Sequence, residues 1–487
     1  MKEKVLKVST IWLALVIMLA SCGQEKKSEC CSKSDLATAP EFYENGYLTE
    51  ASVEGLRKAQ MEIKAISAYE FALPIAGIQK WHRGFLEDGE HGDWVLYDNL
   101  AQKLPILTSN QTTPYTVTYV DLSVSSYYVE IPAGRIGGLV LDLYQRPQAD
   151  LGVMGPDAGK GGKYLLVGPG QDEPKGHDAK WVIHSPCNLV FLGTRIIGYD
   201  EATTDQLRRQ HFVYKVGADK SEQKFIAASE TPNWNGAQST GLQFWKDVYD
   251  VLKNEPVEEM NRIILTQLRD LGITKSGGFN PNEEQKAILT RAAVKGDAMA
   301  MVNTFSKKSY KSRHWPDGNW RYILNQTRLD LMHEDYYEIK EMASFAYEAI
   351  TTSKAMVMPI VGDGSKYLGA YVDDQEEWLD GSNTYEILIP ANAPVKDFWS
   401  IAVYNNKTRT LIDNQQGNAI VNNKGEMKVE ADGSVKVFVS PEAPAGYENN
   451  WVQSNVSEGF FIYFRLYGPL ESYYDKSWKM PDIKRVK

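Results

Sequence analysis

The chain has 487 residues, of which 43% are hydrophobic and 24% are charged, and its formal net charge is -10. This balance excludes a collagen-like, a largely disordered and a polytopic membrane protein, and the acidic charge excludes a general nucleic-acid binder. The length corresponds to about three domains. Tyrosine, at 27 positions, is the most frequent aromatic residue. A tyrosine-rich chain favours pleated sheets with one wetted face.

The first residues are typical of an export signal. Three lysines within the first seven residues precede an apolar run over residues 11–20, which is too short to anchor the chain across a bilayer. The run ends at Leu19-Ala20-Ser21-Cys22, which resembles the bacterial lipobox. In such signals the cysteine is lipidated and becomes the mature N-terminus; the alternative is a plain signal peptide. The sequence therefore predicts a lipoprotein signal over residues 1–21, with lipidation at Cys22.

The segment after the signal, residues 22–40, is polar and predicts a flexible tether that holds the folded part at a membrane. Gly23 is not the aspartate that retains some lipoproteins at the inner membrane. We therefore expect a cell-envelope protein, lipid-anchored at the outer membrane, with the face of that membrane left open. Cys30 and Cys31 are adjacent, so they pair with another chain or stay free, because neighbours pair only in strained geometry. Cys187 lies in an apolar stretch and predicts a packed core thiol.

Residues 41–215 predict an N-terminal β-sandwich domain. A helical pattern covers Ala51–Leu73, and Pro74 is expected to end it. From Tyr115 the apolar period changes to two, which places Tyr115, Val117, Tyr119 and Asp121 on one face of a strand. Further strands are predicted at Tyr127–Pro132, Gly138–Tyr144, Lys163–Val167, Ala179–His184 and Asn188–Ile197.

Residues 216–356 predict a helical connecting region. Its expected helices cover Gln243–Leu252 and Glu255–Leu271, with Gly272 as a C-terminal cap. A further helix is expected to start at Asn280-Pro281-Asn282-Glu283 and run to about Phe305, and another covers roughly Leu329–Thr351.

Residues 357–487 predict a C-terminal β-sandwich domain, in which Asp432-Gly433 is a hairpin turn signal. Its expected strands are Thr384–Ile389, Phe398–Tyr404, Met427–Ala431, Ser434–Val439 and Phe460–Tyr467.

The two β regions share an ordered set of features. Tyr127 and Tyr385 each precede a proline by five residues, and Trp181 and Trp451 each precede an arginine by 14 residues, Arg195 and Arg465. We interpret this as an internal duplication. The expected fold is mixed and mainly β, with two related jelly-roll-like β-sandwiches joined by a helical block.

One strand of each copy places an arginine on an aromatic face. In residues 460–467 one face is fully apolar, and the other carries Phe461, Tyr463, Arg465 and Tyr467. Two interpretations stay open. Each arginine pairs with an aspartate, Asp121 or Asp380, or the arginines and tyrosines form the floor of a cleft that binds an anion or a sugar. The candidate ligand-binding residues are Tyr115, Tyr119, Asp121, Arg195, Trp399, Tyr463, Arg465 and Tyr467.

Several motifs resemble two bacterial domains of unknown function. The C-terminal set resembles the domain numbered 1214, and the N-terminal set resembles its usual companion, numbered 1254. These motifs are Leu379-Asp380-Gly381, residues 385–390 and 394–400, Asp432-Gly433-Ser434, Asn450-Trp451 and residues 464–469, and, N-terminally, residues 113–116, 120–122 and 168–170. The run Val452-Gln453-Ser454 departs from the family pattern, which weakens any function of that loop. The resemblance implies two β-sandwiches in a protein that is often exported and often oligomeric, and it implies no reaction.

Catalytic and metal-binding motifs are absent from the sequence. There is no Gly-x-Ser-x-Gly elbow, phosphate loop or dinucleotide fingerprint. His333-Glu334 begins like a zinc-protease helix, but Tyr337 stands where the second histidine belongs. His91 and His177 lie in polar loops that usually carry no function. We therefore predict no metal site, and no cofactor can be named. The loop 314–320, with two tryptophans, either lines a cleft or packs in the core.

Two functional hypotheses follow. The first is a non-catalytic envelope lipoprotein that binds a small molecule, a glycan or a protein partner, including a second copy of itself. The second is a hydrolase or lyase of unknown class that uses a cleft with tyrosine, arginine and carboxylate groups.

Overall fold

The computed structural model describes residues 42–97, 105–228, 234–306, 310–324 and 331–486. The predicted signal, the tether, Cys22, Cys30 and Cys31 lie outside these residues. The chain divides into two compact units, Met1–Met61 and Glu62–Lys487. In the first, β1 (Tyr43–Glu44) pairs with β2 (Tyr47–Leu48), and α3 (Glu50–Asp88) begins. No helix in the described part of the chain is both long and apolar enough to cross a membrane.

Helix α3 does not end at Pro74 as predicted, but continues to Asp88. A proline inside a helix removes one hydrogen bond and costs about 3 kcal/mol. The turns after Pro74 bury Ile78, Trp81 and Phe85 against the large N-terminal sheet. Each such side chain contributes about 1.5–3 kcal/mol on burial, so the packing outweighs the cost of the proline.

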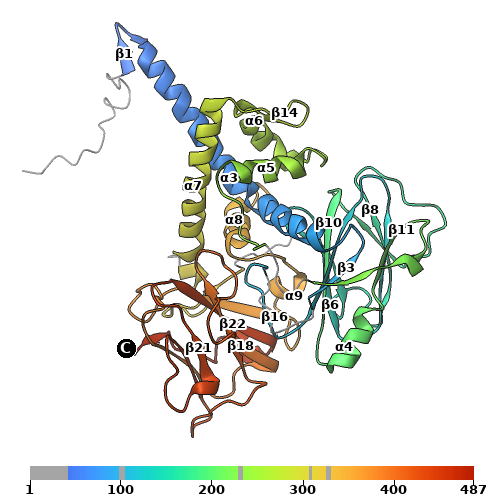
Figure 1. Ribbon diagram of the computed structural model, residues 1–487, viewed down its shortest axis with the longest axis vertical. Coiled ribbons are helices and arrows are strands. Elements are labelled where there is room, and N and C mark those ends of the chain that lie inside the picture. Colours follow the sequence, from blue (N-terminus) through green and yellow to red (C-terminus); the bar gives the residue numbers. More distant parts are fainter. Residues whose placement is uncertain (1–41, 98–104, 229–233, 307–309, 325–330, 487) are drawn as a thin grey trace, which may run out of the picture. The chain divides into compact units, whose positions relative to one another are not determined.

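The N-terminal sandwich packs two sheets face to face (Figure 1). Its larger sheet has the order β12 (Phe225–Ala227), β3 (Trp94–Tyr97), β4 (Tyr115–Asp121), β10 (Leu189–Ile196), β6 (Ile136–Leu141), β7 (Pro147–Gly152). Its smaller sheet has the order β11 (Phe212–Lys215), β5 (Tyr127–Ile131), β8 (Gly162–Val167), β9 (Trp181–His184). The core between the sheets is apolar and includes residues of β10. Cys187, just before β10, is buried as predicted and forms no disulfide.

The C-terminal sandwich is built in the same way. Its larger sheet has the order β15 (Arg321–Tyr322), β16 (Ser365–Ala370), β22 (Phe460–Pro469), β18 (Val395–Asn405), β19 (Ile420–Asn422). Its smaller sheet has the order β21 (Trp451–Gln453), β20 (Val435–Ser440), β17 (Tyr385–Ile389), β23 (Lys484–Arg485).

The two sandwiches share one strand topology. The order β4-β10-β6-β7 corresponds to β16-β22-β18-β19, and β5-β8-β9 corresponds to β17-β20-β21. The smaller sheet of each copy contains one parallel pair, β8 with β9 and β20 with β21, and its other pairings are antiparallel. The fold is therefore mainly β, with two related jelly-roll-like sandwiches, as the repeat predicted.

The strand predicted at Met427–Ala431 is not formed. The side chain of Asn450 takes the hydrogen bonds that a neighbouring strand would supply. Its Oδ1 accepts from the Lys428 amide at 2.9 Å, and its Nδ2 donates to the Lys428 carbonyl at 2.8 Å. At Lys428, the Asn450 side chain thus takes the place of a strand partner.

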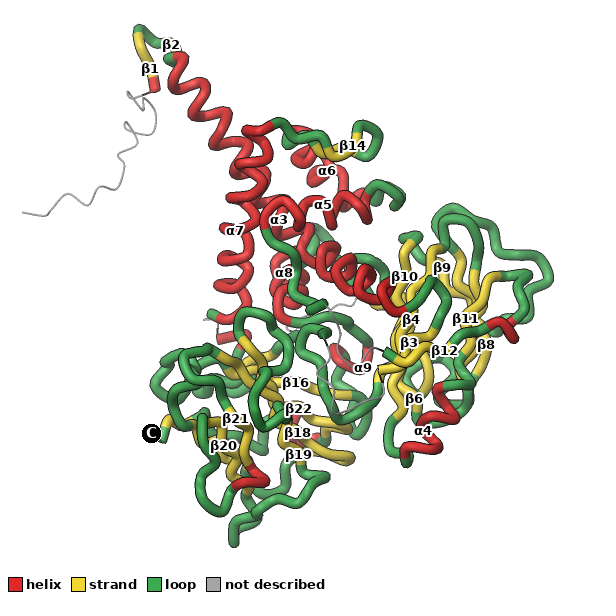
Figure 2. The backbone as a smooth tube through the Cα atoms, viewed as in Figure 1, coloured by secondary structure: helices red, strands yellow, loops and turns green. Residues whose placement is uncertain are grey.

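Most helices lie in the chain between the two groups of strands, and Figure 2 shows helices in red. The α-helices are α4 (Glu201–Arg208), α5 (Gly241–Leu252), α6 (Arg262–Asp270), α7 (Glu283–Phe305), α8 (Ile339–Glu348), α9 (Lys354–Val357) and α10 (Glu471–Tyr474). Shorter elements are β13 (Ile273–Thr274), β14 (Gly278–Phe279) and the 3-10 helices at Lys220–Glu222, Glu259–Asn261, Tyr310–Ser312 and Glu448–Asn450.

Two helix ends follow the predicted signals, and two do not. Asn282 caps α7 in a reciprocal pair with Gln285, and Gly272 follows α6 with φ +81°. The helices predicted at Glu255–Leu271 and Leu329–Thr351 are both shorter than expected, since α6 begins only at Arg262. Residues 331–338 are irregular and pair Met332 with Tyr337, so α8 begins only at Ile339.

The loop 314–320 packs in the core, since Trp315 and Trp320 are both buried.

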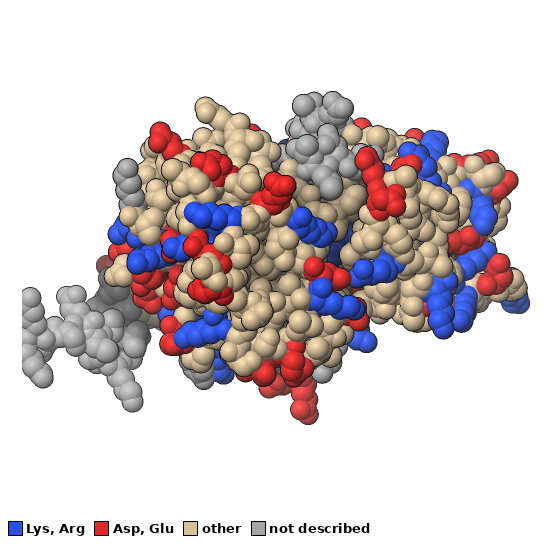
Figure 3. Space-filling view, turned by 90° about the horizontal axis from the view of Figure 1, so that it is seen from below, with Lys and Arg blue, Asp and Glu red and all other residues tan. Residues whose placement is uncertain are grey.

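On the face drawn in Figure 3, Lys and Arg side chains are interspersed with Asp and Glu side chains.

Candidate binding cavity between the two sandwiches

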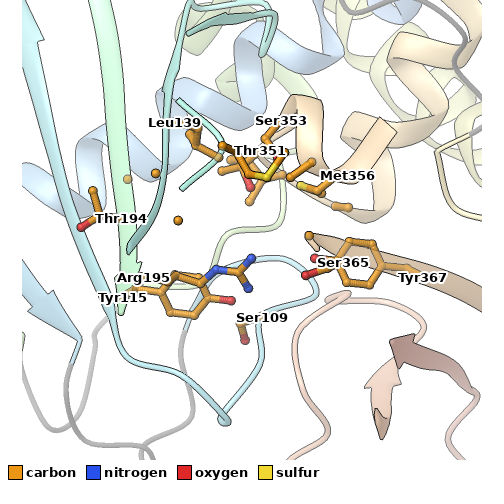
Figure 4. Close-up of a pocket in the computed structure, with 18 of the residues that line it drawn as sticks. Ser109, Tyr115, Leu139, Thr194, Arg195, Thr351, Ser353, Met356, Ser365 and Tyr367 are labelled. Carbon is orange, nitrogen blue, oxygen red and sulfur yellow. The ribbon is translucent and has the colours of Figure 1, made fainter. Parts of the chain in front are cut away.

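A cavity of about 160 Å³ lies between the larger sheets of the two sandwiches (Figure 4). Strands β4, β10, β6 and β7 line it from the N-terminal sandwich, and β16 and β22 line it from the C-terminal one. Trp81 of α3 and the segments 106–109 and 349–356 complete the wall. The volume is close to that of an engineered cavity of about 150 Å³ that holds benzene. The space therefore suits a small organic molecule.

The N-terminal sheet leaves space for the cavity because the residues on its cavity face change from large aromatics to glycines along the strands. Toward one end, Tyr119 and Phe191 pack against α3. Toward the other end, the same face carries Gly137 and Gly193 next to Arg195. A Cβ at Gly137 would meet only the Ile197 Cδ1 atom, at 3.9 Å. Glycine at this position keeps the floor of the cavity open.

The C-terminal sheet faces the cavity with its polar aromatic side. Tyr367, Arg465 and Ser400 stand in register on three neighbouring strands, and Ser365 and Tyr467 stand beside them. Alternation along the strands turns the apolar side chains of the same sheet to the opposite face. This is the two-faced strand that the sequence predicted.

Arg465 is held in place by the N-terminal half of the chain. Its Nη2 donates to the Tyr404 hydroxyl at 2.7 Å, to the Ser109 carbonyl at 3.3 Å and to the Thr108 carbonyl. Its guanidinium carbon lies 5.0 Å from the centre of the Tyr367 ring. These contacts satisfy a buried cation with carbonyl oxygens, a hydroxyl and an aromatic face.

Arg195 differs from Arg465 in having no such partners. It stands opposite Tyr115 in the strand register, and its guanidinium extends toward Ser365 and Tyr367 (Figure 4). Arg195 makes no hydrogen bond or ion pair within the described residues. Its surroundings are the Tyr115, Tyr367 and Arg465 side chains. A cation in this position lacks the neutralising partner that buried charges normally have.

Hydroxyl groups near the two arginines add to this polarity. Burial raises the pKa of Tyr115, and the guanidinium groups of Arg195 and Arg465 oppose that rise. The hydroxyls of Tyr467 and Ser109 line the cavity, are buried and have no hydrogen-bond partner in the described part of the chain. Two cations and neutral hydroxyl donors near one space can bind an anion, although Asp150, Asp363 and Asp397 also line the cavity.

Asp150 of β7 also lines the cavity, and it is 8% exposed. Its Oδ1 accepts a hydrogen bond from the Lys354 amide at 3.3 Å. Its Oδ2 is buried without a hydrogen-bond partner among the described residues. Burial raises the pKa of Asp150 to about 6, although the backbone amides of Lys354 and Ala355 oppose the rise. This carboxyl group can change its protonation state near neutral pH.

An ion pair joins the two sandwiches beside the cavity. Arg135, in the turn before β6, donates from Nη2 to Asp397 Oδ1 of β18 at 3.1 Å. The Arg135 side chain is 49% exposed and the Asp397 side chain is 26% exposed, so the pair lies where the cavity wall meets solvent. An exposed pair of this kind contributes less than about 1 kcal/mol.

Five of the eight residues proposed from sequence line the cavity: Tyr115, Arg195, Tyr463, Arg465 and Tyr467. The other three lie elsewhere, each for a reason of strand geometry. Tyr119 is on the correct face but packs against Phe85 of α3. Asp121 is six residues along β4 from Tyr115, about 20 Å away. Trp399 pairs with Leu466 on the apolar face, because its neighbour Ser400 occupies the cavity side.

The predicted pairing of each arginine with an aspartate is wrong. The side chain of Asp121 accepts from the Ser123 amide, and the side chain of Asp380 accepts from the Ser382 amide. Each caps a local turn near the end of a strand, far along the sheet from the arginine of its own sandwich. Arg465 uses carbonyl oxygens instead, and Arg195 faces the cavity.

Sequence reasoning missed Tyr367, Gly137 and Asp150. The internal repeat contained the signal for Tyr367, because Tyr367 stands opposite Arg465 as Tyr115 stands opposite Arg195. Gly137 and Asp150 become visible only from the pairing of β6 with β10 and with β7.

No group of three or more His, Cys, Asp or Glu side chains suited to a metal ion occurs in the described residues. His82 Nε2 and His91 Nε2 are 2.7 Å apart, and burial lowers the pKa of His82 to about 3. His333 lies 3.0 Å from Glu338. These contacts stabilise local structure.

The protein thus has two β-sandwiches of the same topology, with a cavity between them that is lined by arginine and tyrosine residues. The family model described as "Protein of unknown function (DUF1254)" matches residues 95–215, and the one described as "Protein of unknown function (DUF1214)" matches residues 364–471. The chain thus matches both domains, in the order that the motifs indicated. Each match covers the strands that carry one of the two arginines.

The chain resembles a solved structure in fold. The VPA0106 protein from Vibrio parahaemolyticus is 17% identical, with a TM-score of 0.52, over 88% of this chain and 100% of that one. An uncharacterized protein from Burkholderia cenocepacia is 14% identical, with a TM-score of 0.42, over 89% of this chain and 98% of that one. No curated protein matches the chain.

Proposed function

We propose that the protein binds a small anionic molecule, with a carboxylate as the simplest case, in the cavity between its sandwiches. The observation that carries the proposal is Arg195, a cation on the cavity wall without a hydrogen-bonding or ionic partner among the described residues. Arg465 and the hydroxyls of Tyr115, Tyr467 and Ser109 surround the same space. A bound carboxylate would accept two parallel hydrogen bonds from Arg195 and reduce the repulsion between the two guanidinium groups.

The apolar part of the wall limits what else the ligand contains. Trp81, Ile106, Leu139 and Phe345 line the cavity beside the polar groups. Binding sites for small molecules combine such apolar walls with a few polar groups that fix orientation. A glycan, which the sequence left open, would expose many hydroxyl groups to these walls, so a compact organic acid fits better.

A thermal-shift screen tests the proposal. We expect short carboxylates, but not the matching alcohols, to raise the melting temperature of the purified protein, because ligands that bind only the native state stabilise it. The control is Gly137→Val, which places a branched side chain in the cavity floor. If no acid stabilises the wild-type protein, or if Gly137→Val responds equally, the proposal fails.

A hydrolase or lyase is the second candidate, and Asp150 is the observation that favours it. Burial raises its pKa to about 6 inside a cavity that also carries cationic groups, which suits proton transfer near neutral pH. The test is product formation from any acid found to bind. Turnover by the wild-type protein that is lost in Asp150→Asn would support an enzyme, and a bound acid recovered unchanged would support a binding protein.

We also propose that the protein is a lipoprotein of the cell envelope, attached through Cys22. The basic start, the short apolar run and the small residues before this cysteine support it. Labelling of the expressed protein with a radioactive fatty acid tests this. Label in the wild type that disappears in Cys22→Ser is the expected result, and an unlabelled wild type would contradict it.

A further inference from the structure

We infer that the ligand of this cavity carries two functional groups, a carboxylate that binds Arg195 and, at its other end, an amino or hydroxyl group that donates to Asp150. This inference rests on the proposed function and narrows its ligand class to short amino or hydroxy acids.

The two residues face the same space from different strands. Arg195 of β10 pairs with Gly137 of β6, and Asp150 of β7 pairs with Leu139, two residues farther along β6. All four positions point to one face of the sheet, because side chains alternate. Two strand spacings and two residues along the strand separate the Cα atoms of Arg195 and Asp150 by roughly 12 Å.

The picture of the cavity agrees with two separate polar ends. Arg195 and Tyr115 lie on one side, and Thr351 and Ser353 lie across the open space with Leu139 (Figure 4). Asp150 accepts from the amide of Lys354, the residue that follows Ser353. Asp150 therefore lies on the same sheet face as Arg195 but beside the segment that carries Thr351 and Ser353.

The carboxyl group of Asp150 has unused capacity to accept a hydrogen bond. Oδ1 is occupied by the Lys354 amide, whereas Oδ2 is buried and makes no hydrogen bond within the part of the chain that the structure describes. A buried acceptor without a partner is costly, and a ligand donor would remove that cost. An amine would in addition neutralise the carboxylate.

A purely structural role for Asp150 makes a different prediction. The bond from the Lys354 amide orders the start of α9 and needs only Oδ1. Asparagine preserves an oxygen for this bond and replaces the second oxygen with an NH₂ group, which repels a ligand donor. Asp150→Asn thus separates the two roles.

Calorimetry with matched probes provides the test. The probes are 4-aminobutyrate, 5-aminopentanoate and 6-aminohexanoate, each compared with the acid of equal length that lacks the amine: butyrate, pentanoate and hexanoate. For at least one length we expect the amino acid to bind the wild-type protein ten times more tightly or better than the plain acid, as a charge-assisted hydrogen bond would give. In Asp150→Asn this advantage should vanish while binding of the plain acid is retained.

The outcomes distinguish the two proposals. If the plain acids bind and the amino acids bind equally or worse at every length, the inference is overturned and the proposed function stands. If neither series binds the wild-type protein, the proposed function fails as well. Retained binding of the plain acid by Asp150→Asn shows that the variant is folded. If both series weaken in it alike, Asp150 acts only through the structure.

Discussion

Tyr115 and Tyr367 occupy equivalent positions in the two sandwiches, and each stands directly opposite an arginine on the neighbouring strand. Tyr115 of β4 pairs with Arg195 of β10, and Tyr367 of β16 pairs with Arg465 of β22. A duplicated sandwich has therefore placed two copies of one tyrosine–arginine pair on opposite walls of a single cavity. The two copies differ in their contacts. Arg465 donates hydrogen bonds to backbone carbonyl groups of the N-terminal half of the chain, whereas Arg195 makes no such bond to the C-terminal half.

Because Arg465 is hydrogen-bonded and Arg195 is not, we expect their substitution to have different effects on the free energy of unfolding. Arg465→Met removes the donors to the carbonyl oxygens of Thr108 and Ser109 and to the hydroxyl of Tyr404, all in buried surroundings. Losing one partner of a buried, hydrogen-bonded charge costs about 3 kcal/mol or more. We expect urea unfolding to show this loss in Arg465→Met. Arg195→Met, which breaks no hydrogen bond to a described residue, should be neutral or stabilising. Equal losses would contradict the distinction.

Adjacent glycines in β6 provide a matched pair for the shape of the cavity. A Cβ at Gly137 meets only Ile197 Cδ1 at 3.9 Å, whereas a Cβ at Gly138 comes within 2.9 Å of the Leu151 Cβ atom. Gly137→Val should therefore fold normally and lose ligand binding. Gly138→Val should lose about 1–3 kcal/mol through overpacking. Thermal unfolding measures both, and a strongly destabilised Gly137→Val would contradict the open space assigned to the cavity.

The carboxyl group of Asp150 predicts a pH-dependent term in stability. Burial raises its pKa from 3.8 to about 6, so the folded state holds this proton more tightly than the unfolded state does. Its contribution to stability is fully present below about pH 4 and is lost as the pH rises through 6. The loss is at most about 3 kcal/mol, from about two units at 1.36 kcal/mol each.

Asp150→Asn isolates this term from the buried Glu255, whose pKa burial raises to about 7. The variant keeps Glu255, so both proteins share that titration. We expect the variant to gain stability over the wild type between pH 4 and pH 7.5 in denaturant unfolding at a series of pH values. A constant difference across this range would show that Asp150 does not titrate there.

The sequence predicted the architecture well because its signals are local. Alternating strands, the spacing from Trp181 to Arg195 and the capping residue Asn282 each depend on neighbours in the chain. Prediction from the sequence failed where contacts between residues distant in the chain determine the local structure. Pro74 lies inside α3 because the turns after it are buried, and the Met427–Ala431 segment is not a strand because Asn450 satisfies it.

The same division applies to the candidate site. Alternation identified Arg195, Arg465 and three of the tyrosines, because it assigns residues to faces of a strand. It could not tell which end of a face is covered, so Tyr119, beneath α3, was included. Asp150 is two strands away from Arg195, in a sheet whose strand order cannot be derived from the sequence. Strand order and the covering helix are tertiary facts, and they decide which part of the polar face becomes a cavity.

The central claim is that Arg195 anchors an anionic group in this cavity, and calorimetric titration of a short carboxylate into the wild type, Arg195→Gln and Arg195→Lys tests it most directly. Glutamine removes the charge, and lysine keeps the charge but loses the planar two-donor geometry. We predict saturable one-site binding by the wild type, a loss of at least tenfold in affinity in Arg195→Gln and an intermediate affinity in Arg195→Lys. Equal affinity in all three proteins, or no binding by the wild type to any acid tested, would contradict the claim.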